Sequence, residues 1–196
     1  AFKGADAVVA FSVPGPHTLN ASWIKSMAPK SIVFACANPV PEIYPYAAKE
    51  AGAFIVATGR GDFHNQVNNS VCFPGILKGV LSVRAKKITD SMAINAAQSI
   101  ASFSESKGIS PDKIIASMDE NELFAKLAAD TAVCAIKEKT AAIETDYETV
   151  YSSVMEETAR VRKSIELLFD SGIIKELPKE IIDEVFQQTL LSAGKK

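Results

Sequence analysis

Residues 31–36 read Ser31-Ile32-Val33-Phe34-Ala35-Cys36, a run in which apolar side chains follow one another without polar alternation. Two similar runs lie before and after it, at residues 7–11 and 53–57. Continuous rather than alternating hydrophobicity is typical of strands that are buried on both faces of a parallel sheet. The three runs therefore predict three parallel β-strands.

The segments between these runs have helical spacing. Thr18 or Asn20 is suited to cap a first helix that ends near Pro29, and a second helix is expected at residues 42–51, where Gly52 provides a stop. Strands that alternate with helices in this way imply right-handed crossovers. We expect an α/β fold: a partial Rossmann-like, doubly wound parallel sheet followed by a C-terminal helical tail.

The pattern changes after the third strand. Residues 58–75 are rich in Gly, Asn and Pro, which is typical of an ordered loop. Helices are then expected to begin at Pro74 and Thr89, and a helical turn is expected at residues 110–112, because proline suits the first helical position. From Glu120 onward almost every segment has helical spacing.

These patterns divide the chain into a sheet domain at residues 1–105 and a helical segment at residues 106–196. The first domain lacks the G-x-G-x-x-G turn that holds a pyrophosphate in a dinucleotide fold. A complete fold of that kind also needs strands before residue 1. We therefore expect the chain to be part of a longer protein.

Composition narrows the class without indicating a reaction. The chain is 47% hydrophobic and 22% charged, with a formal net charge of −2, so no strong field favours nucleic acid or an anionic membrane. No apolar run approaches the roughly 20 residues needed to span a bilayer. Cys36, Cys72 and Cys134 are odd in number and widely spaced, which indicates no disulfide framework and favours a cytoplasmic location.

Ligands of open parallel sheets bind beyond the carboxyl ends of the strands. The predicted strands lead there into residues 12–15, into Asn38-Pro39 and into residues 58–62, and Asn68-Asn69 follows shortly afterwards. These loops predict the rim of a pocket.

The charged residues of these loops have alternative interpretations. Arg60 is expected to pair with Asp62 on the surface. The carboxylates of Asp62 and Glu42 are candidate metal ligands, although solvated loop acids are commoner. His17 and His64 are expected at the surface or at helix entries rather than as catalytic bases.

Several short motifs occur in a fixed order along the first half of the chain: Ala37-Asn38-Pro39 with Pro41-Glu42, Ala57-Thr58-Gly59-Arg60 followed by Asp62, Asn65-Gln66-Val67-Asn68-Asn69, and Phe73-Pro74-Gly75-Ile76. Together they resemble the malic enzymes, and most closely the shorter, bacterial-type members. The resemblance covers residues 5–101. It identifies residues 1–105 as the C-terminal half of an NAD(P)-binding domain.

The resemblance implies oxidative decarboxylation of malate to pyruvate and carbon dioxide with reduction of NAD or NADP, NAD being preferred. It implies that the backbone of Ser12 and Val13 follows the cofactor ribose, that Asn38 contacts the nicotinamide end and the substrate, and that Asn69, with Asn68, binds a malate carboxylate.

The family's catalytic lysine and tyrosine and its three acidic metal ligands would precede Ala1. No catalytic residue and no metal ligand is therefore assigned to this chain, and Mg²⁺ or Mn²⁺ is expected to be held mainly by residues outside it.

Two alternatives remain at this stage. One is another NAD(P)-dependent hydroxy- or amino-acid dehydrogenase, and the other is a non-catalytic nucleotide-fold module used for association. The apolar stripe of the tail must pack on something, and together with the resemblance it predicts a homodimer. Neither nucleic acid nor a membrane is expected as a partner.

Overall fold

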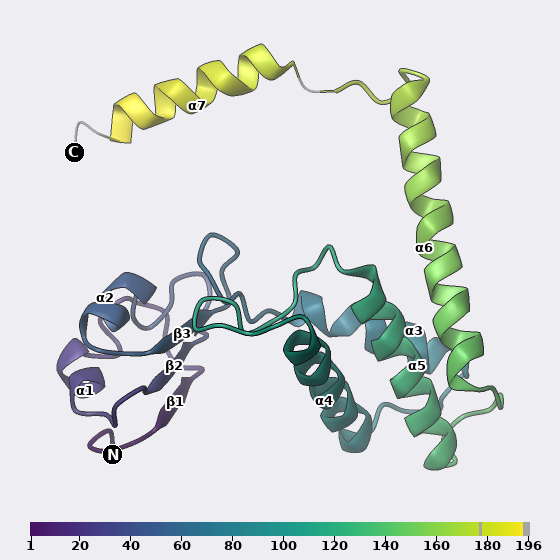
Figure 1. Ribbon diagram of the computed structural model, residues 1–196, viewed down its shortest axis with the longest axis horizontal. Coiled ribbons are helices and arrows are strands. Elements are labelled where there is room, and N and C mark those ends of the chain that lie inside the picture. The colour runs from purple at the N-terminus through teal and green to yellow at the C-terminus, as the bar shows by residue number, and fades with distance from the viewer. Residues whose placement is uncertain (177, 194–196) are drawn as a thin grey trace. The chain divides into compact units, whose positions relative to one another are not determined.

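The computed structural model describes residues 1–176 and 178–193. The chain divides into two compact units, Ala1–Met155 and Glu156–Lys196. The first unit contains a sheet with two short helices, followed by a group of packed helices (Figure 1).

The sheet has three parallel strands in the order β1-β2-β3, and they are β1 (Ala7–Ala10), β2 (Ile32–Ala35) and β3 (Ile55–Thr58). The predicted strands are confirmed to within two residues at each end. The register aligns Ala10, Ala35 and Thr58, so all three strands end at the same edge of the sheet. This α/β architecture confirms the predicted fold class.

Helices α1 (Ala21–Lys25) and α2 (Pro45–Glu50) connect the strands. The side-chain oxygen of Asn20 accepts a hydrogen bond from the Ser22 N–H, so Asn20 rather than Thr18 caps α1. Helix α2 begins later than predicted, because proline disfavours helical geometry in the residue before it and Tyr44 is extended. As a result Glu42 lies in the loop before the helix.

Both connecting helices contribute to a core against one face of the sheet, which contains Ile24, Ala48 and the central strand residue Val33. The other face is uncovered at β1, where Val9 is 58% exposed and Phe11 just beyond the strand is 80% exposed. The expectation that the first strand is buried on both faces is therefore wrong for the part of the chain that the structure describes. Among the described residues, β1 is an edge strand of the three-stranded sheet, and α1 and α2 pack on the opposite face.

The helical part of the first unit begins with a short 3-10 helix and three longer helices: η1 (Asn69–Val71), α3 (Phe73–Ser82), α4 (Asp90–Ser106) and α5 (Asn121–Lys137). The Thr89 hydroxyl accepts from the Met92 N–H, which confirms the predicted start of α4. Helix α5 packs against α3 and α4 within the first unit. The domain boundary between residues 105 and 106 stays a prediction.

Helices α3 and α5 approach closely at two glycines of α3. A Cβ atom on Gly75 would lie 2.4 Å from Leu127 Cβ, and one on Gly79 would lie 2.5 Å from the carbonyl oxygen of Ala128. Real Cβ atoms do not come so near to other heavy atoms. The spacing of four residues places both glycines on one face of α3, and this face lies against α5.

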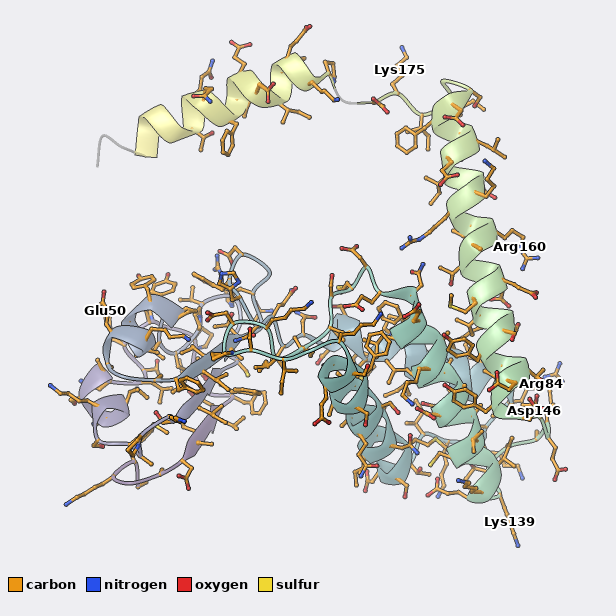
Figure 2. The ribbon with its side chains drawn as sticks, in the orientation of Figure 1. Glu50, Arg84, Lys139, Asp146, Arg160 and Lys175 are labelled. Carbon is orange, nitrogen blue, oxygen red and sulfur yellow. The ribbon has the colours of Figure 1, made fainter. Side chains whose placement is uncertain are left out.

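Helices α3 and α5 are each followed, two residues after their last residue, by a residue in the left-handed conformation, Arg84 at φ 49° and Lys139 at φ 57°. Figure 2 labels both residues. In each case the next N–H bonds back into the last turn: Ala85 N–H donates to Val80 O, and Thr140 N–H donates to Ala135 O. This arrangement satisfies carbonyl groups that a helix end leaves without partners, and glycine usually occupies the left-handed position.

The buried side chain of Asn65 joins the sheet to the loop before α5. Its amide donates to the carbonyl oxygens of Val56 at 3.0 Å and Pro111 at 2.8 Å, and its oxygen accepts from the Ile114 N–H at 2.9 Å. The helical turn predicted at residues 110–112 is wrong. Ser110 and Lys113 instead form an isolated bridge, since the Pro111 carbonyl is held by Asn65 and not by an N–H further along a helix.

Helix α6 (Tyr147–Asp170) carries apolar residues every three or four positions. Within the first unit Val150 and Val154 are buried with residues of α5. In the second unit the stripe continues through Val161, Ile165 and Leu168, and all three are at least 36% exposed.

The last helix, α7 (Lys179–Ala193), also exposes apolar side chains, among them Ile181, Val185 and Phe186. No helix in the described ranges is both long and apolar enough to cross a membrane.

Candidate functional site

A cavity of about 270 Å³ lies at the carboxyl ends of β2 and β3. It is lined by residues of the loops that follow the three strands and of the loop before η1: Phe11, Cys36, Ala37, Asn38, Gly59, Arg60, Val67, Asn68 and Asn69. We call it the strand-end cavity. This edge is where open parallel sheets bind ligands, because the loops diverge there and expose backbone and side-chain polar groups.

Three of the residues predicted to bind substrate or cofactor, Asn38, Asn68 and Asn69, line the strand-end cavity together. Among the described residues, the side-chain amides of Asn38 and Asn69 have no hydrogen-bond partner, and both residues are exposed. Each amide group therefore has donors and an acceptor available for a ligand. The role predicted for these residues is untested, but the geometry allows it.

Asn68 differs from its two neighbours in the cavity. Its side-chain nitrogen donates to Gly59 O at 3.0 Å, and its side-chain oxygen accepts from the Ser70 N–H at 3.0 Å. These bonds connect the loop after β3 to the start of η1. The Asn68 amide is thus engaged within the protein, which makes Asn69 the better placed of the two for a substrate.

Ser12 and Val13, which were predicted to follow the cofactor ribose, do not line the strand-end cavity. The Ser12 N–H and hydroxyl are both occupied by the Glu42 carboxylate, at 2.7 and 3.0 Å. The Val13 carbonyl accepts from the Thr18 hydroxyl at 3.1 Å. The Ser12 carbonyl and the Val13 N–H are the backbone groups of these two residues that remain for a ligand.

Glu42 is fully buried, so its interpretation as a solvated loop acid is wrong. One carboxylate oxygen accepts both bonds from Ser12, and the other accepts from the Ala37 N–H at 3.0 Å. Burial opposes ionisation, but the bonds from Ser12 and Ala37 outweigh it and hold the pKa of Glu42 below its ordinary value. Glu42 thus connects the loop after β1 to the loop after β2 as a carboxylate.

The predicted pairing of Arg60 with Asp62 is confirmed. The guanidinium donates to both carboxylate oxygens, at 2.8 and 2.6 Å, and also to the Pro39 carbonyl at 3.1 Å. Pro39 follows Asn38 through a cis peptide bond. The Arg60 pair therefore supports the backbone next to Asn38 from the far side of the cavity rim.

The described residues contain no group of three or more His, Cys, Asp or Glu side chains able to hold a metal ion. All three cysteines are free thiols. Burial raises the pKa of Cys36 and of Cys72, which makes both thiols poor nucleophiles. Nothing in the described part of the chain thus supplies a metal centre or an activated cysteine.

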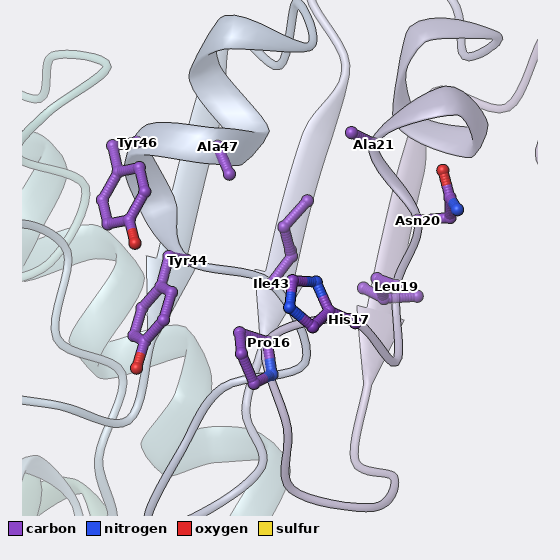
Figure 3. A pocket seen from close by; sticks show the side chains of 9 residues that line it. All are labelled: Pro16, His17, Leu19, Asn20, Ala21, Ile43, Tyr44, Tyr46 and Ala47. Atoms are coloured by element: carbon purple, nitrogen blue, oxygen red, sulfur yellow. The ribbon is translucent and has the colours of Figure 1, made fainter.

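A second cavity, of about 480 Å³, lies between the loops that lead into α1 and α2. Figure 3 shows His17 and Ile43 within it and the rings of Tyr44 and Tyr46 at one side. The two tyrosine rings stack with centroids 5.3 Å apart. This cavity shares no lining residue with the strand-end cavity, so the predicted site residues lie elsewhere.

The structural roles of two residues that connect loops around the site were not predicted from the sequence. Glu42 and Asn65 both lie in motifs that were recognised, but their partners are distant along the chain: Ser12 is 30 residues from Glu42, and Pro111 is 46 residues from Asn65. The only local signal was a polar side chain between segments that pack into the core.

Comparison with known proteins agrees with this geometry. A family model described as "Malic enzyme, NAD binding domain" matches residues 16–137. The bifunctional malic/malolactic enzyme of Bacillus subtilis is 42% identical over 146 residues, which cover 74% of this chain and 35% of that protein. This chain thus spans about a third of the length of that relative.

Solved structures give the same result. The crystal structure of Entamoeba histolytica malic enzyme superimposes with a TM-score of 0.92 at 54% identity, covering 97% of this chain and 40% of the other. Malic enzyme from Pyrococcus horikoshii gives a TM-score of 0.74 at 46% identity over 79% of this chain and 35% of the other. On the family match and these likenesses, the chain belongs to the malic enzyme family, and its residues 16–137 match the NAD-binding domain of that family.

Proposed function

We propose that this chain supplies nicotinamide and malate contacts to an enzyme that oxidises and decarboxylates malate to pyruvate and carbon dioxide. One observation carries the proposal. In a chain of the malic enzyme family, Asn38 and Asn69 line one cavity at the strand ends, and neither side-chain amide has a partner within the described residues. The cavity has roughly the size needed for a nicotinamide ring with a small diacid.

The two amides suit different parts of this task. Asn69 would donate to a malate carboxylate, because an amide orients an anion by hydrogen bonding without adding a charge that competes with a cation. Asn38 would contact the carboxamide end of the nicotinamide and the substrate together. The Ser12 carbonyl and the Val13 N–H would border the ribose.

The cofactor supplies the hydride acceptor, and we propose NAD as the preferred form with NADP as the alternative. A divalent ion, Mg²⁺ or Mn²⁺, would act as a Lewis acid toward substrate oxygens. Because the described residues include no cluster of metal ligands, we propose that this ion is held mainly by groups outside the chain. The roles given to Asn38 and Asn69 do not involve the ion.

The test is an assay of the complete open reading frame that encodes this sequence. Malate, Mn²⁺ and NAD⁺, then NADP⁺, are added, and the near-ultraviolet absorbance of the reduced cofactor is followed together with pyruvate formation. Stoichiometric appearance of both products supports the proposal. Reduction of cofactor without pyruvate would indicate a simple hydroxy-acid dehydrogenase, and absence of both would favour a non-catalytic module.

We further propose a homodimer in a cytoplasmic compartment. The exposed apolar stripes of α6 and α7 support self-association, because contiguous apolar surface is costly to leave in water. The three free thiols support a reducing compartment. Light scattering of the purified protein gives its mass in solution. A dimer that dissociates in an Ile165→Glu variant supports the proposal, and a monomeric wild-type protein contradicts it.

A further inference from the structure

Glu42 is a buried anion without a cation. Its side chain is fully buried, and its carboxylate accepts three hydrogen bonds from Ser12 and Ala37. None of the ion pairs found among the described residues involves Glu42. Buried charges are usually paired, because desolvation is costly and hydrogen bonds lower that cost without cancelling the charge.

The hydrogen bonds fix the charge in its ionised form. Two of the three bonds come from backbone N–H groups, which can only donate, so this surrounding favours the carboxylate over the protonated acid. Two backbone hydrogen bonds also join the loop after β1 to the loop after β2. The Leu19 N–H donates to the backbone carbonyl oxygen of Glu42 at 3.0 Å, and the Gly15 N–H donates to that of Val40 at 3.3 Å. The negative charge therefore has one fixed position at the carboxyl ends of β1 and β2.

The field of this charge reaches the strand-end cavity. Ala37, whose N–H binds the carboxylate, lines the cavity beside Asn38. Cys36 lines it as well, and the pKa of its thiol is raised by burial and by the negative charge of Glu42. The carboxylate is thus one hydrogen bond away from Ala37, a residue of the cavity wall.

We propose that Glu42 is a positioning and specificity-determining residue, whose buried negative charge makes the site at Asn38 bind the oxidised, cationic nicotinamide more tightly than the reduced, neutral one. This inference rests on the proposed function, because it assumes that the nicotinamide enters the strand-end cavity. The physical reason is that a fixed negative charge near the site attracts a cationic ring and has no such effect on a neutral ring of nearly the same shape. The charge would favour binding of NAD⁺, which accepts the hydride, and would ease the release of NADH after the reaction.

The experiment compares dissociation constants of NAD⁺ and NADH, measured by calorimetry and by fluorescence, in the complete open reading frame. Glu42→Gln keeps the shape and removes the charge. We expect Glu42→Gln to raise the ratio of the dissociation constant of NAD⁺ to that of NADH about tenfold. Ser12→Ala is the matched control, because it removes one hydrogen bond to the carboxylate and leaves the charge. If Glu42 served only to maintain the structure, each variant would weaken the binding of NAD⁺ and of NADH by the same factor. That result would overturn the inference.

A second pair of variants keeps the test decisive if Glu42→Gln does not fold. Val13 is exposed beside Ser12, so Val13→Lys adds a positive charge near the carboxylate, and Val13→Gln is its neutral counterpart. We expect the lysine variant, relative to the glutamine variant, to lose preference for NAD⁺. An equal preference in both would contradict the proposed role of Glu42.

A cofactor-independent measurement separates this inference from the proposed function. In a background of Cys72→Ser and Cys134→Ser, the pH dependence of Cys36 alkylation reports the field of Glu42 in the cavity. We expect alkylation of Cys36 to begin at lower pH in Glu42→Gln than in the parent. If that shift occurs but the wild-type protein binds neither NAD⁺ nor NADH, the charge reaches the cavity and the proposed function is wrong. If cofactors bind and neither the ratio nor the alkylation changes, the inference alone is wrong.

Discussion

Gly79 of α3 faces the backbone of α5 so closely that a Cβ atom at this position would lie 2.5 Å from the carbonyl oxygen of Ala128. The obstacle is backbone, so no side-chain rotation relieves it, and the two helices must separate to accept any larger residue. A hydrogen atom at this position is what permits the packing of the helical core next to η1 and Asn69.

We expect Gly79→Ala to lower the free energy of unfolding by about 1–3 kcal/mol, despite the higher helix propensity of alanine. Urea denaturation followed by circular dichroism measures the change. Ser82→Ala, at the end of the same helix, is the control and should change stability by less than about 0.5 kcal/mol. Equal effects of the two substitutions would show that the helices are not closely packed at Gly79.

Asn65→Asp should destabilise the protein at neutral pH, because the new carboxylate would face the carbonyl oxygens of Val56 and Pro111. The repulsion raises the pKa of the introduced group in the folded state. The stability of the variant relative to the wild type is therefore greatest below the pKa that the aspartate has in the unfolded chain. It falls as pH rises through the pKa of the same group in the folded protein. Thermal denaturation at about pH 7 and about pH 5 measures the difference. A variant that loses stability equally at both would contradict the assigned bonds.

Glu42 should contribute to acid sensitivity. Its folded pKa is lowered, so its hydrogen bonds contribute stability above the ordinary carboxyl pKa, and this is lost as pH falls through the lowered value. We expect the unfolding free energy of Glu42→Gln to change less than that of the wild type on acidification from about pH 5 to about pH 3. Parallel curves for the two proteins would mean that the carboxylate is not held as the structure shows.

The two adjacent asparagines should respond differently to truncation. Asn69→Ala removes an amide without partners among the described residues, so we expect unchanged stability and an increase of about ten- to hundredfold in the KM for malate, with little change in the KM for cofactor. Asn68→Ala should instead lower the melting temperature, because it breaks the bonds to Gly59 and Ser70. Steady-state kinetics and calorimetry on both variants make the comparison, and an effect of Asn69→Ala on both KM values would contradict its role.

Lys139→Gly should stabilise the protein by about 0.5–1 kcal/mol, since Lys139 has a positive φ and its Cβ atom strains that conformation. Lys137→Gly, in the last turn of the same helix, is the matched control and should cost about 1 kcal/mol. Opposite signs for two equivalent chemical changes, measured by urea denaturation, are the expected result.

The sequence predicted those features that depend on neighbours along the chain. The strands followed from uninterrupted apolar runs, and the start of α4 followed from the capping hydroxyl of Thr89. Convergence of Asn38 with Asn69 followed from the common edge at which parallel strands end, together with the family resemblance. In each case the local pattern contained the information.

The remaining features depend on partners that are distant in sequence. The burial of Glu42 requires Ser12, and the tight turn at Pro111 requires Asn65. A carboxylate in a loop has the same local signature whether it is surrounded by water or accepts three hydrogen bonds from N–H and O–H groups of the protein. Only the assembled loops distinguish the two cases.

The three hydrogen bonds of Asn65 also have a kinetic consequence. Its partners come from β3 and from the segment before α5, with α3 and α4 between them in the chain, so the bonds close a long loop. The cost in chain entropy of closing that loop arises before the bonds form. These bonds therefore belong to the late part of folding, and truncation of Asn65 should mainly accelerate unfolding rather than slow folding.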